Sequence, residues 1–255
     1  MALVSVDPGW QVALALTLLL ALAIGAHRIA GYDLARTSFI AAARAVIQLT
    51  VVALLIKAVV GNLALSGLFS LAMFGMGVLT TSRRIEAPRA WIWSAAAMAA
   101  GVLPVLAIVL STGAVPFNGL AIIPIAGIVV GNAMTANTLV GRRAFAALRD
   151  ERPQYEAALS LGMRPAWAIE LSIHRRAPEA LLPGLDQITT TGVVTLPGAF
   201  IGVMLGGGTP VQAATAQALV LFGIMAAQTI TVAVAERLIA GRRLLPEDLR
   251  ASLIN

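Results

Sequence analysis

The chain has 255 residues, of which 59% are hydrophobic and 12% charged, with a net charge of +6 at pH 7. Because a soluble domain carries roughly 25% charged residues, this composition excludes a soluble fold of the same length, and the mean hydropathy of +0.88 indicates a membrane protein. The arginines recur between apolar runs without interleaved aromatic residues, so we expect no nucleic-acid partner. The absence of cysteine excludes disulfides, thiolate metal sites and a cysteine nucleophile.

Seven apolar stretches in the sequence are long enough to cross a lipid bilayer as helices, which takes about 20 residues. These predicted spans are Gly9–Ala26, Thr37–Ile56, Asn62–Ser82, Ala90–Thr112, Phe117–Gly141, Ala180–Gly207 and Pro210–Ala235. They predict an all-α polytopic membrane protein in which residues 1–255 form a single transmembrane domain.

The distribution of basic residues predicts the orientation of these spans. Of the 18 lysines and arginines, all but Arg44 and Lys57 lie in loops on one side of the predicted membrane domain. Since loops rich in Lys and Arg stay in the cytoplasm, we expect this side to be cytoplasmic. With an odd number of spans, the N-terminus then lies outside and the C-terminus in the cytoplasm.

Residues 142–179, between the fifth and sixth predicted spans, form the one long polar segment. The segment holds seven of the 18 basic residues and five of the 12 acidic residues. It is rich in helix formers, which favours an ordered structure over a simple linker. A structured, charged segment on one side of a membrane protein is typical of a surface that binds a soluble partner.

Prolines and a glycine divide this polar segment into short helices. Pro153 disfavours helical geometry in the residue before it and can open a new helix. We therefore predict a short helix over Gln154–Leu161 that ends at Gly162, and a second helix, opened by Pro165, over Ala166–Arg176. Together they predict a helix–turn–helix segment at the cytoplasmic surface of the membrane.

The first of these short helices has a face of small apolar residues. Ala157, Ala158 and Leu161 lie at helical spacing, and Glu156 places a charge near the start of the helix. Two interpretations are open. The face packs on the protein's own membrane domain, or it is the docking surface for another protein.

The run from Glu156 to Gly162 fits Glu-Ala-Ala-x-x-x-Gly and resembles the cytoplasmic loop signature of ABC-transporter permeases. In that family a short coupling helix docks into a cleft on the ATPase, and the signature continues with a Leu-Pro pair that is displaced here. Further motifs, in order along residues 40–235, are similar to those of the FetB-type permeases: Arg44-x-x-x-Gln48-Leu49, Gly131-Asn132-Ala133-Met134, Arg176-x-x-x-x-x-Leu182-Pro183, Leu196-Pro197-Gly198-x-x-x-Gly202 and Leu205-Gly206-Gly207-Gly208-x-Pro210.

The FetB-type permeases are membrane subunits of ABC transporters to which iron export is attributed, and they are related to plant aluminium-tolerance permeases. The resemblance implies a multi-pass protein of the bacterial inner membrane that exports iron or another metal. It also implies two partners, a cytosolic ABC ATPase and a second copy of the permease. The residues that it assigns to ATPase coupling are Glu156, Ala157, Ala158, Leu161 and Gly162.

The chain has no ATP-binding motif of its own. A P-loop requires a lysine after Gly-x-x-x-x-Gly, and the single lysine, Lys57, follows the run Val51–Ile56. We therefore expect no enzymatic activity in this chain and no cofactor. His27 and His174 are far apart in sequence and do not form a metal-ligand pair, so no metal site is assigned.

Charged and polar residues within the predicted spans are candidates for a transport pathway or gate. Arg44 and Gln48 lie one turn apart on the second span, and Asp186 lies at a similar depth on the sixth, with Thr189 and Thr190 on its face. An Arg44–Asp186 pair would neutralise both charges, and we predict that replacing both residues is milder than the sum of the single changes. Alternatively, Arg44 reaches back to the interface, or the pair only fixes helix packing.

Two Pro-Gly pairs lie in the predicted sixth span, Pro183-Gly184 and Pro197-Gly198, and we expect both to break the helix. Freed carbonyl groups at membrane depth are tolerated where they are buried in protein or line a cavity. Kinked packing and a substrate site are both open interpretations of this span.

The fifth span carries small residues on one face: Gly127, Gly131, Thr135 and Thr138. Small residues four apart allow helices to approach closely, which predicts a helix–helix seam. Asn132, on the neighbouring face, is expected to make an interhelical hydrogen bond or to line a pathway.

An alternative function from a different class is a gradient-driven secondary transporter or channel that uses Asp186 as its ion-coupled acid. This alternative predicts transport that needs no ATPase and follows the proton gradient.

Overall fold

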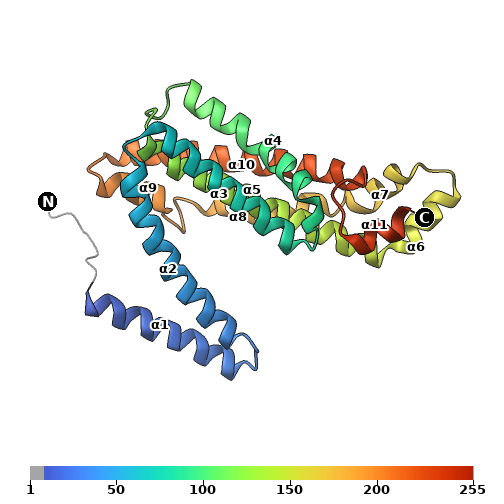
Figure 1. Ribbon diagram of the computed structural model, residues 1–255, viewed down its shortest axis with the longest axis horizontal. Coiled ribbons are helices and arrows are strands. Elements are labelled where there is room, and N and C mark those ends of the chain that lie inside the picture. The colour runs from blue at the N-terminus through green and yellow to red at the C-terminus, as the bar shows by residue number, and fades with distance from the viewer. Residues whose placement is uncertain (1–8, 255) are drawn as a thin grey trace. The chain divides into compact units, whose positions relative to one another are not determined.

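The computed structural model describes residues 9–254, and the regular elements of this range are helices (Figure 1). Contacts divide the chain into two compact units, Met1–Gly61 and Asn62–Asn255. Among the described residues, six helices are long and apolar enough to cross a membrane. The predicted class, an all-α polytopic membrane protein, is therefore confirmed.

The first unit contains α1 (Trp10–Ile29) and α2 (Ala35–Val59). Neither helix has a buried residue, as is typical of apolar helices that are surrounded by lipid or by other helices. Gly31 has a φ of +70° in the turn between them, and the hydroxyl of Ser38 lies 3.0 Å from Nε2 of His27 across that turn. The predicted outside location of the N-terminus concerns residues 1–8, which lie outside the described residues.

The second unit contains four long helices that match predicted spans. They are α3 (Leu63–Arg84), α4 (Trp91–Ser111), α5 (Gly119–Asp150) and α10 (Pro210–Ala240), with a short 3-10 helix η1 (Pro88–Ala90) before α4. The side chain of Asn62 caps α3, Asn118 caps α5, and Thr209 forms a capping box with Gln212 at the start of α10.

The predicted sixth span is interrupted. After a 3-10 helix η2 (Ala177–Ala180), α8 (Leu182–Thr190) and α9 (Gly198–Leu205) are separated by residues 191–197. Gly192, with a φ of +87°, and Pro197, the N-cap of α9, lie in or next to this interruption. Next to Pro183-Gly184 the helix is also interrupted: η2 ends at Ala180, and both residues lie in the first turn of α8, where a missing N–H is tolerated, so Pro183 marks a helix start.

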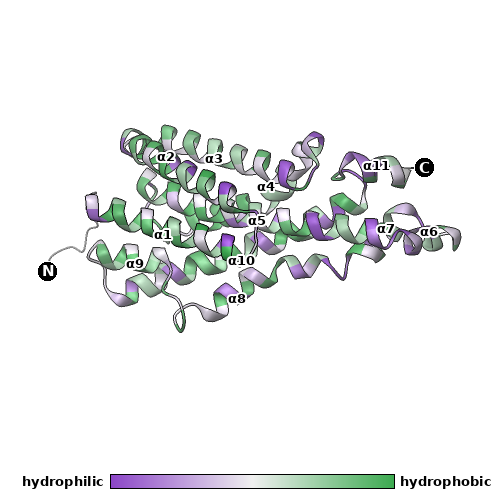
Figure 2. Cartoon of the chain, turned by 90° about the horizontal axis from the view of Figure 1, so that it is seen from below, coloured by the Kyte–Doolittle hydropathy of each residue, from purple (hydrophilic) through white to green (hydrophobic). Residues whose placement is uncertain are grey.

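Helices α3, α5 and α10 end at the same end of the second unit, where α6 (Arg152–Ser160), α7 (Pro165–Ile173) and α11 (Glu247–Ile254) lie (Figure 1). We call residues 85–90, 151–176 and 241–254 the charged end. Hydrophilic residues are frequent there, whereas hydrophobic residues dominate the long helices (Figure 2). The three arginine-rich segments of this unit therefore lie together, as predicted, while their location in the cytoplasm stays a prediction.

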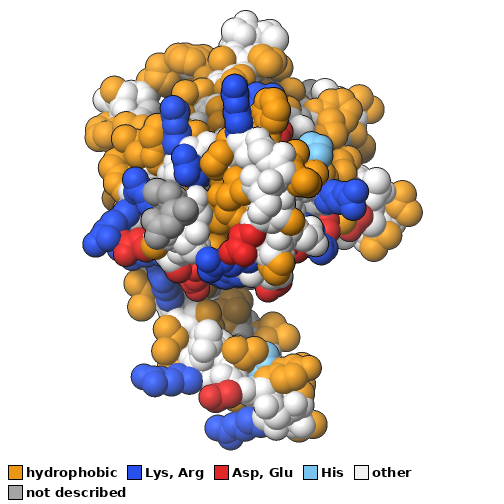
Figure 3. Space-filling view, turned by 90° about the vertical axis from the view of Figure 1, so that its right-hand side faces the viewer, with side chains coloured by type: hydrophobic (Ala, Val, Ile, Leu, Met, Phe, Trp, Pro, Cys, Tyr) orange, Lys and Arg blue, Asp and Glu red, His pale blue; other side chains and the backbone are white. Residues whose placement is uncertain are grey.

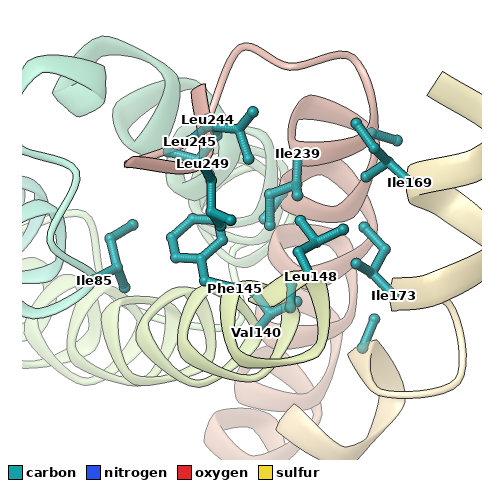
Figure 4. Packing of buried hydrophobic residues seen from close by; sticks show 14 of the residues in the cluster. Ile85, Val140, Phe145, Leu148, Ile169, Ile173, Ile239, Leu244, Leu245 and Leu249 are labelled. Carbon is teal, nitrogen blue, oxygen red and sulfur yellow. The ribbon is translucent and has the colours of Figure 1, made fainter. Parts of the chain in front are cut away.

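Two hydrophobic clusters hold the second unit together. One joins α3, α4, α5 and α10 in the middle of the bundle, around Met98, Val102 and Val129. The other extends to the charged end, where Phe145 of α5 and Ile169 of α7 are buried with residues of α10 and α11 (Figure 4). Helix α11 is not among the predicted elements.

Small residues set the closest helix contacts. A Cβ atom at Gly101 of α4 would lie 2.3 Å from the Ala227 carbonyl oxygen of α10, and one at Gly127 would lie 2.7 Å from the Met73 methyl of α3. Thr138 joins α5 to α3 through its hydroxyl, 2.8 Å from that of Thr81. At Gly131, by contrast, an added Cβ would meet no atom within 4 Å. Within the second unit, the predicted seam therefore has a close contact at Gly127 and none at Gly131.

We expect Gly101→Ala to lower the stability of the bundle by about 1–3 kcal/mol, since α4 must move away from the α10 backbone to admit one methyl group. The midpoint of thermal unfolding in detergent or nanodiscs measures this change. Gly131→Ala is the matched control, and we expect it to keep or raise the midpoint, because Ala is favoured over Gly in a helix interior by about 0.5–1 kcal/mol. Equal midpoints for the two variants would contradict the close contact.

Candidate functional site

The α6–α7 hairpin is the most exposed part of the charged end. Pro153 lies in the first turn of α6, and Pro165 in the first turn of α7, where their fixed φ suits the start of a helix. Between the helices, Gly162 adopts a φ of +84°, a conformation that glycine reaches without strain. The sequence therefore dictates two short helices joined by a tight turn, close to the predicted bounds.

The inner face of α6 is held by a buried tyrosine. The side chains of Tyr155 and Ala158 point into the protein, and the Tyr155 hydroxyl donates to the Leu253 carbonyl oxygen of α11 at 3.1 Å. Burial raises the pKa of Tyr155, and nearby Arg242 opposes this change, so the hydroxyl stays protonated and remains a donor at neutral pH. Sequence reasoning missed this contact because it required α11.

Ala158 was expected on the docking face, and this is wrong. It is only 6% exposed, because successive helical residues differ by about 100° and Ala158 shares the inner face with Tyr155. The exposed members of the predicted set are Glu156, Ala157, Leu161 and Gly162.

The tip of the hairpin exposes a large apolar side chain between charges. Leu161 is 85% exposed, beside the Gly162 turn. On the same helix, Nε of Arg152 lies 2.9 Å from the Glu156 carboxylate, an exposed pair one turn apart. Figure 3 looks onto this end, where acidic and basic side chains surround hydrophobic ones. Leu161 therefore presents an apolar side chain at the tip that another protein surface can bury.

Helix α7 turns two different faces to its surroundings. Ile169 and Ile173 are completely buried against α5 and α10, whereas Trp167 and Leu171 are exposed on the outer side. The Arg164 guanidinium lies 5.7 Å from the centre of the Trp167 ring. The outer face therefore combines apolar and basic groups next to the α6 tip.

A groove of about 430 Å³ lies beside the hairpin and has charged walls. Its lining residues are Glu151, Gln154, Leu171, Ser172, Arg175, Arg176 and Glu179. Arg176 reaches the carboxylates of Glu151 and Glu179, each at 3.6 Å, and Arg143 forms an ion pair with Glu179. These pairs connect α5 and the junction between α5 and α6 to η2.

His174, which follows α7, contacts a carboxylate of α10. Its Nδ1 lies 2.7 Å from Oε1 of Glu236, whose side chain is only 14% exposed. The hydrogen bond that the His174 ring donates to the Glu236 carboxylate, together with the charge of Glu236, raises the pKa of His174, and the charge of Glu170 adds to this effect. This contact joins the end of α7 to α10, and protonation of the imidazole strengthens it.

Three of the candidate pathway residues lie together on α8. The hydroxyls of Thr189 and Thr190 donate to the main-chain oxygen of Asp186, and all three residues are exposed on α8. Arg44 and Gln48 belong to the other unit, so the Arg44–Asp186 pair stays a prediction.

Asn132 makes an interhelical hydrogen bond, which was one of the two expectations for it. Its Oδ1 accepts from Nε2 of Gln228 on α10 at 3.3 Å, and its Nδ2 donates to the Ile128 carbonyl oxygen. The side chain of Gln228 also occupies the space beside Gly184, where a Cβ would lie 2.0 Å from its Oε1. Gln228, a polar residue within an apolar run, is the signal that sequence reasoning missed.

No metal centre is assembled by these groups. Among residues 9–254, no group of three or more His, Asp or Glu side chains is placed to hold a metal ion.

Comparison with protein families matches residues 9–244 to the family described as "Uncharacterised protein family (UPF0014)". The rice (Oryza sativa subsp. japonica) UPF0014 membrane protein STAR2 is 31% identical over 196 residues, which are 75% of this chain and 68% of STAR2. FetB of Escherichia coli (strain K12), named a probable iron export permease protein, is 31% identical over 195 residues, 75% of either chain. Protein ALUMINUM SENSITIVE 3 of Arabidopsis thaliana is 28% identical over 193 residues, 74% of this chain and 70% of that protein. No solved structure matches the chain.

The apolar helices and the charged helical end define a multi-pass integral membrane protein of the permease class. The chain belongs to the UPF0014 family. The resemblance to the FetB-type permeases is confirmed: STAR2 is named a membrane protein and FetB a probable permease protein.

We expect the His174–Glu236 contact to make stability depend on pH. Because the pKa of His174 is raised in the folded state, the contact stabilises fully below the ordinary histidine pKa of about 6.5 and is lost as pH rises through the raised value. The midpoint of thermal unfolding should therefore fall across this window, and His174→Gln should remove that fall. His27→Gln, at the only other histidine, is the control and should retain it. An unchanged pH profile in His174→Gln would contradict the role of the contact.

Proposed function

We propose that this chain is the membrane permease subunit of an ABC transporter, driven by a separate cytosolic ATPase that docks on the α6–α7 hairpin. The observation that carries the proposal is the 85% exposed Leu161 at the tip of a hairpin whose inner faces are buried. An exposed apolar tip on a rigid base provides a contact area without a large loss of conformational entropy on binding. The tip also lies within Glu156–Gly162, the run that resembles the cytoplasmic loop signature of ABC-transporter permeases, and this resemblance supports the proposal.

The transported substrate is proposed to be a metal ion moving out of the cell, with iron as the first candidate. The support is the name of FetB, a probable iron export permease protein, and the similarity of this chain to it over 75% of its length. The ATPase activity would reside in the partner, because the sequence contains no P-loop lysine.

We further propose that two copies of the chain form the working transporter. The exposed face of α8 carries Asp186, Thr189 and Thr190 in the predicted sixth span. Polar groups at membrane depth favour neighbouring protein or water over lipid. A second copy facing α8 would provide that surrounding and place these residues along a transport path.

The test is purification of the tagged chain in mild detergent from cells of its source, followed by identification of soluble proteins that are recovered in stoichiometric amounts. We expect an ATPase with a P-loop, and we expect Glu156→Lys to abolish its recovery, because the reversed charge lies on the docking face next to Arg152. Leu161→Ala should weaken binding by about tenfold or more, as truncation of a central apolar contact does.

Asp33→Lys is the matched control, since it reverses an exposed charge in the other unit. It should leave recovery unchanged. Full recovery of the ATPase with Glu156→Lys and Leu161→Ala would contradict docking at α6. Transport that needs no ATPase and follows the proton gradient would support the alternative in which Asp186 is the ion-coupled acid.

A further inference from the structure

The C-terminal helix α11 is held in the hydrophobic cluster of the charged end. Leu249 and Leu253, one turn apart, are 4% and 3% exposed. Leu249 lies beside Phe145 of α5, together with Leu244 and Leu245 of the preceding segment (Figure 4). Helix α11 is therefore fixed to the part of α5 that precedes the hairpin.

The far end of α11 is tied to α6. The Leu253 carbonyl oxygen accepts from the Tyr155 hydroxyl at 3.1 Å and from Nη1 of Arg242 at 3.5 Å. It lies at the C-terminal end of α11, where carbonyl oxygens have no partner within the helix. Since the Tyr155 ring is buried and its hydroxyl has this acceptor, loss of the contact would leave a buried hydroxyl without its α11 acceptor and loosen α6, which also packs on α5 and α7.

The near end of α11 is tied to the turn between α3 and α4. Arg149 bridges Asp248 of α11, at 2.8 Å, and Glu86 of that turn, at 3.5 Å. Arg89 of η1 pairs with Glu247 at 2.6 Å. Exposed pairs of this kind contribute little singly, but here two of them act on one short helix that is already packed.

We propose that α11 is a positioning element that makes α6 and the α3–α4 turn one rigid block, with Tyr155 and Asp248 as its positioning residues. A movement imposed on α6 then reaches α3 and α4 through α11, in addition to the routes through α5, which precedes α6 in the chain, and α7, which packs on α6. Transmission of such a movement rests on the proposed function, whereas the rigidity of the block is a property of the chain alone.

Hydrogen exchange of the purified full-length chain tests the rigidity. Tyr155→Phe removes one hydroxyl, keeps the ring, and should raise exchange of the α6 amides about three- to tenfold, the effect of losing one buried hydrogen bond. Asp248→Asn should raise exchange over residues 85–90 by about twofold. Arg250→Gln, on the same helix with an exposed side chain, is the control and should match the wild type. Wild-type exchange in both Tyr155→Phe and Asp248→Asn would overturn the proposal.

Transport per ATP hydrolysed, measured with the co-purified ATPase in proteoliposomes, tests the transmission. We expect the double variant Tyr155→Phe with Asp248→Asn to keep the ATPase bound and to lower this ratio at least threefold. Faster exchange with an unchanged ratio would overturn transmission through α11. If no ATPase is recovered with the wild type, the proposed function fails, and transmission with it, while the exchange result still decides whether α11 holds α6.

Discussion

The length of α5 and α10 is the constraint on which the rest of the second unit depends. With 32 and 31 residues, they reach about 48 Å and 46 Å, whereas the hydrocarbon core of a bilayer is about 30 Å thick. Each helix is therefore longer than the hydrocarbon core is thick, and some of its turns must lie outside the core. Both helices end at the charged end, and the arginines there predict that the outlying turns are the last ones. Burial continues along these turns, at Phe145 and Ile239, so they need protein around them.

Helices α7 and α11 provide that covering, and this explains why the charged segment is ordered. The buried face of α7 and the leucines of α11 enclose the last turns of α5 and α10, and the hairpin tip stands on this packed base. Burying the exposed Leu161 side chain against a partner would contribute about 1.5–3 kcal/mol. A force applied at the tip therefore acts on helices that continue into the membrane bundle.

The sequence alone predicted the long helices well, because uninterrupted apolar runs bounded by capping residues and arginines leave few alternatives. It also located the hairpin, since Pro153, Gly162 and Pro165 act through local geometry. It failed where tertiary contacts decide. Which side of α6 is buried depends on its packing against α5 and α7 and on the Tyr155 contact with α11, so Ala158 was placed on the wrong face. The Gln228–Asn132 contact joins residues 96 apart in the chain, and periodicity carries no information about such pairs.

Site-specific photo-crosslinking tests the central claim, that the hairpin tip is where the driving partner binds. The photoreactive amino acid p-benzoylphenylalanine would replace Leu161 in one variant and Val193, 88% exposed between α8 and α9, in another. After irradiation of intact membranes, the account predicts a crosslinked product that contains a P-loop ATPase from position 161 and none from position 193. No such product from position 161, or equal amounts from both positions, would contradict it.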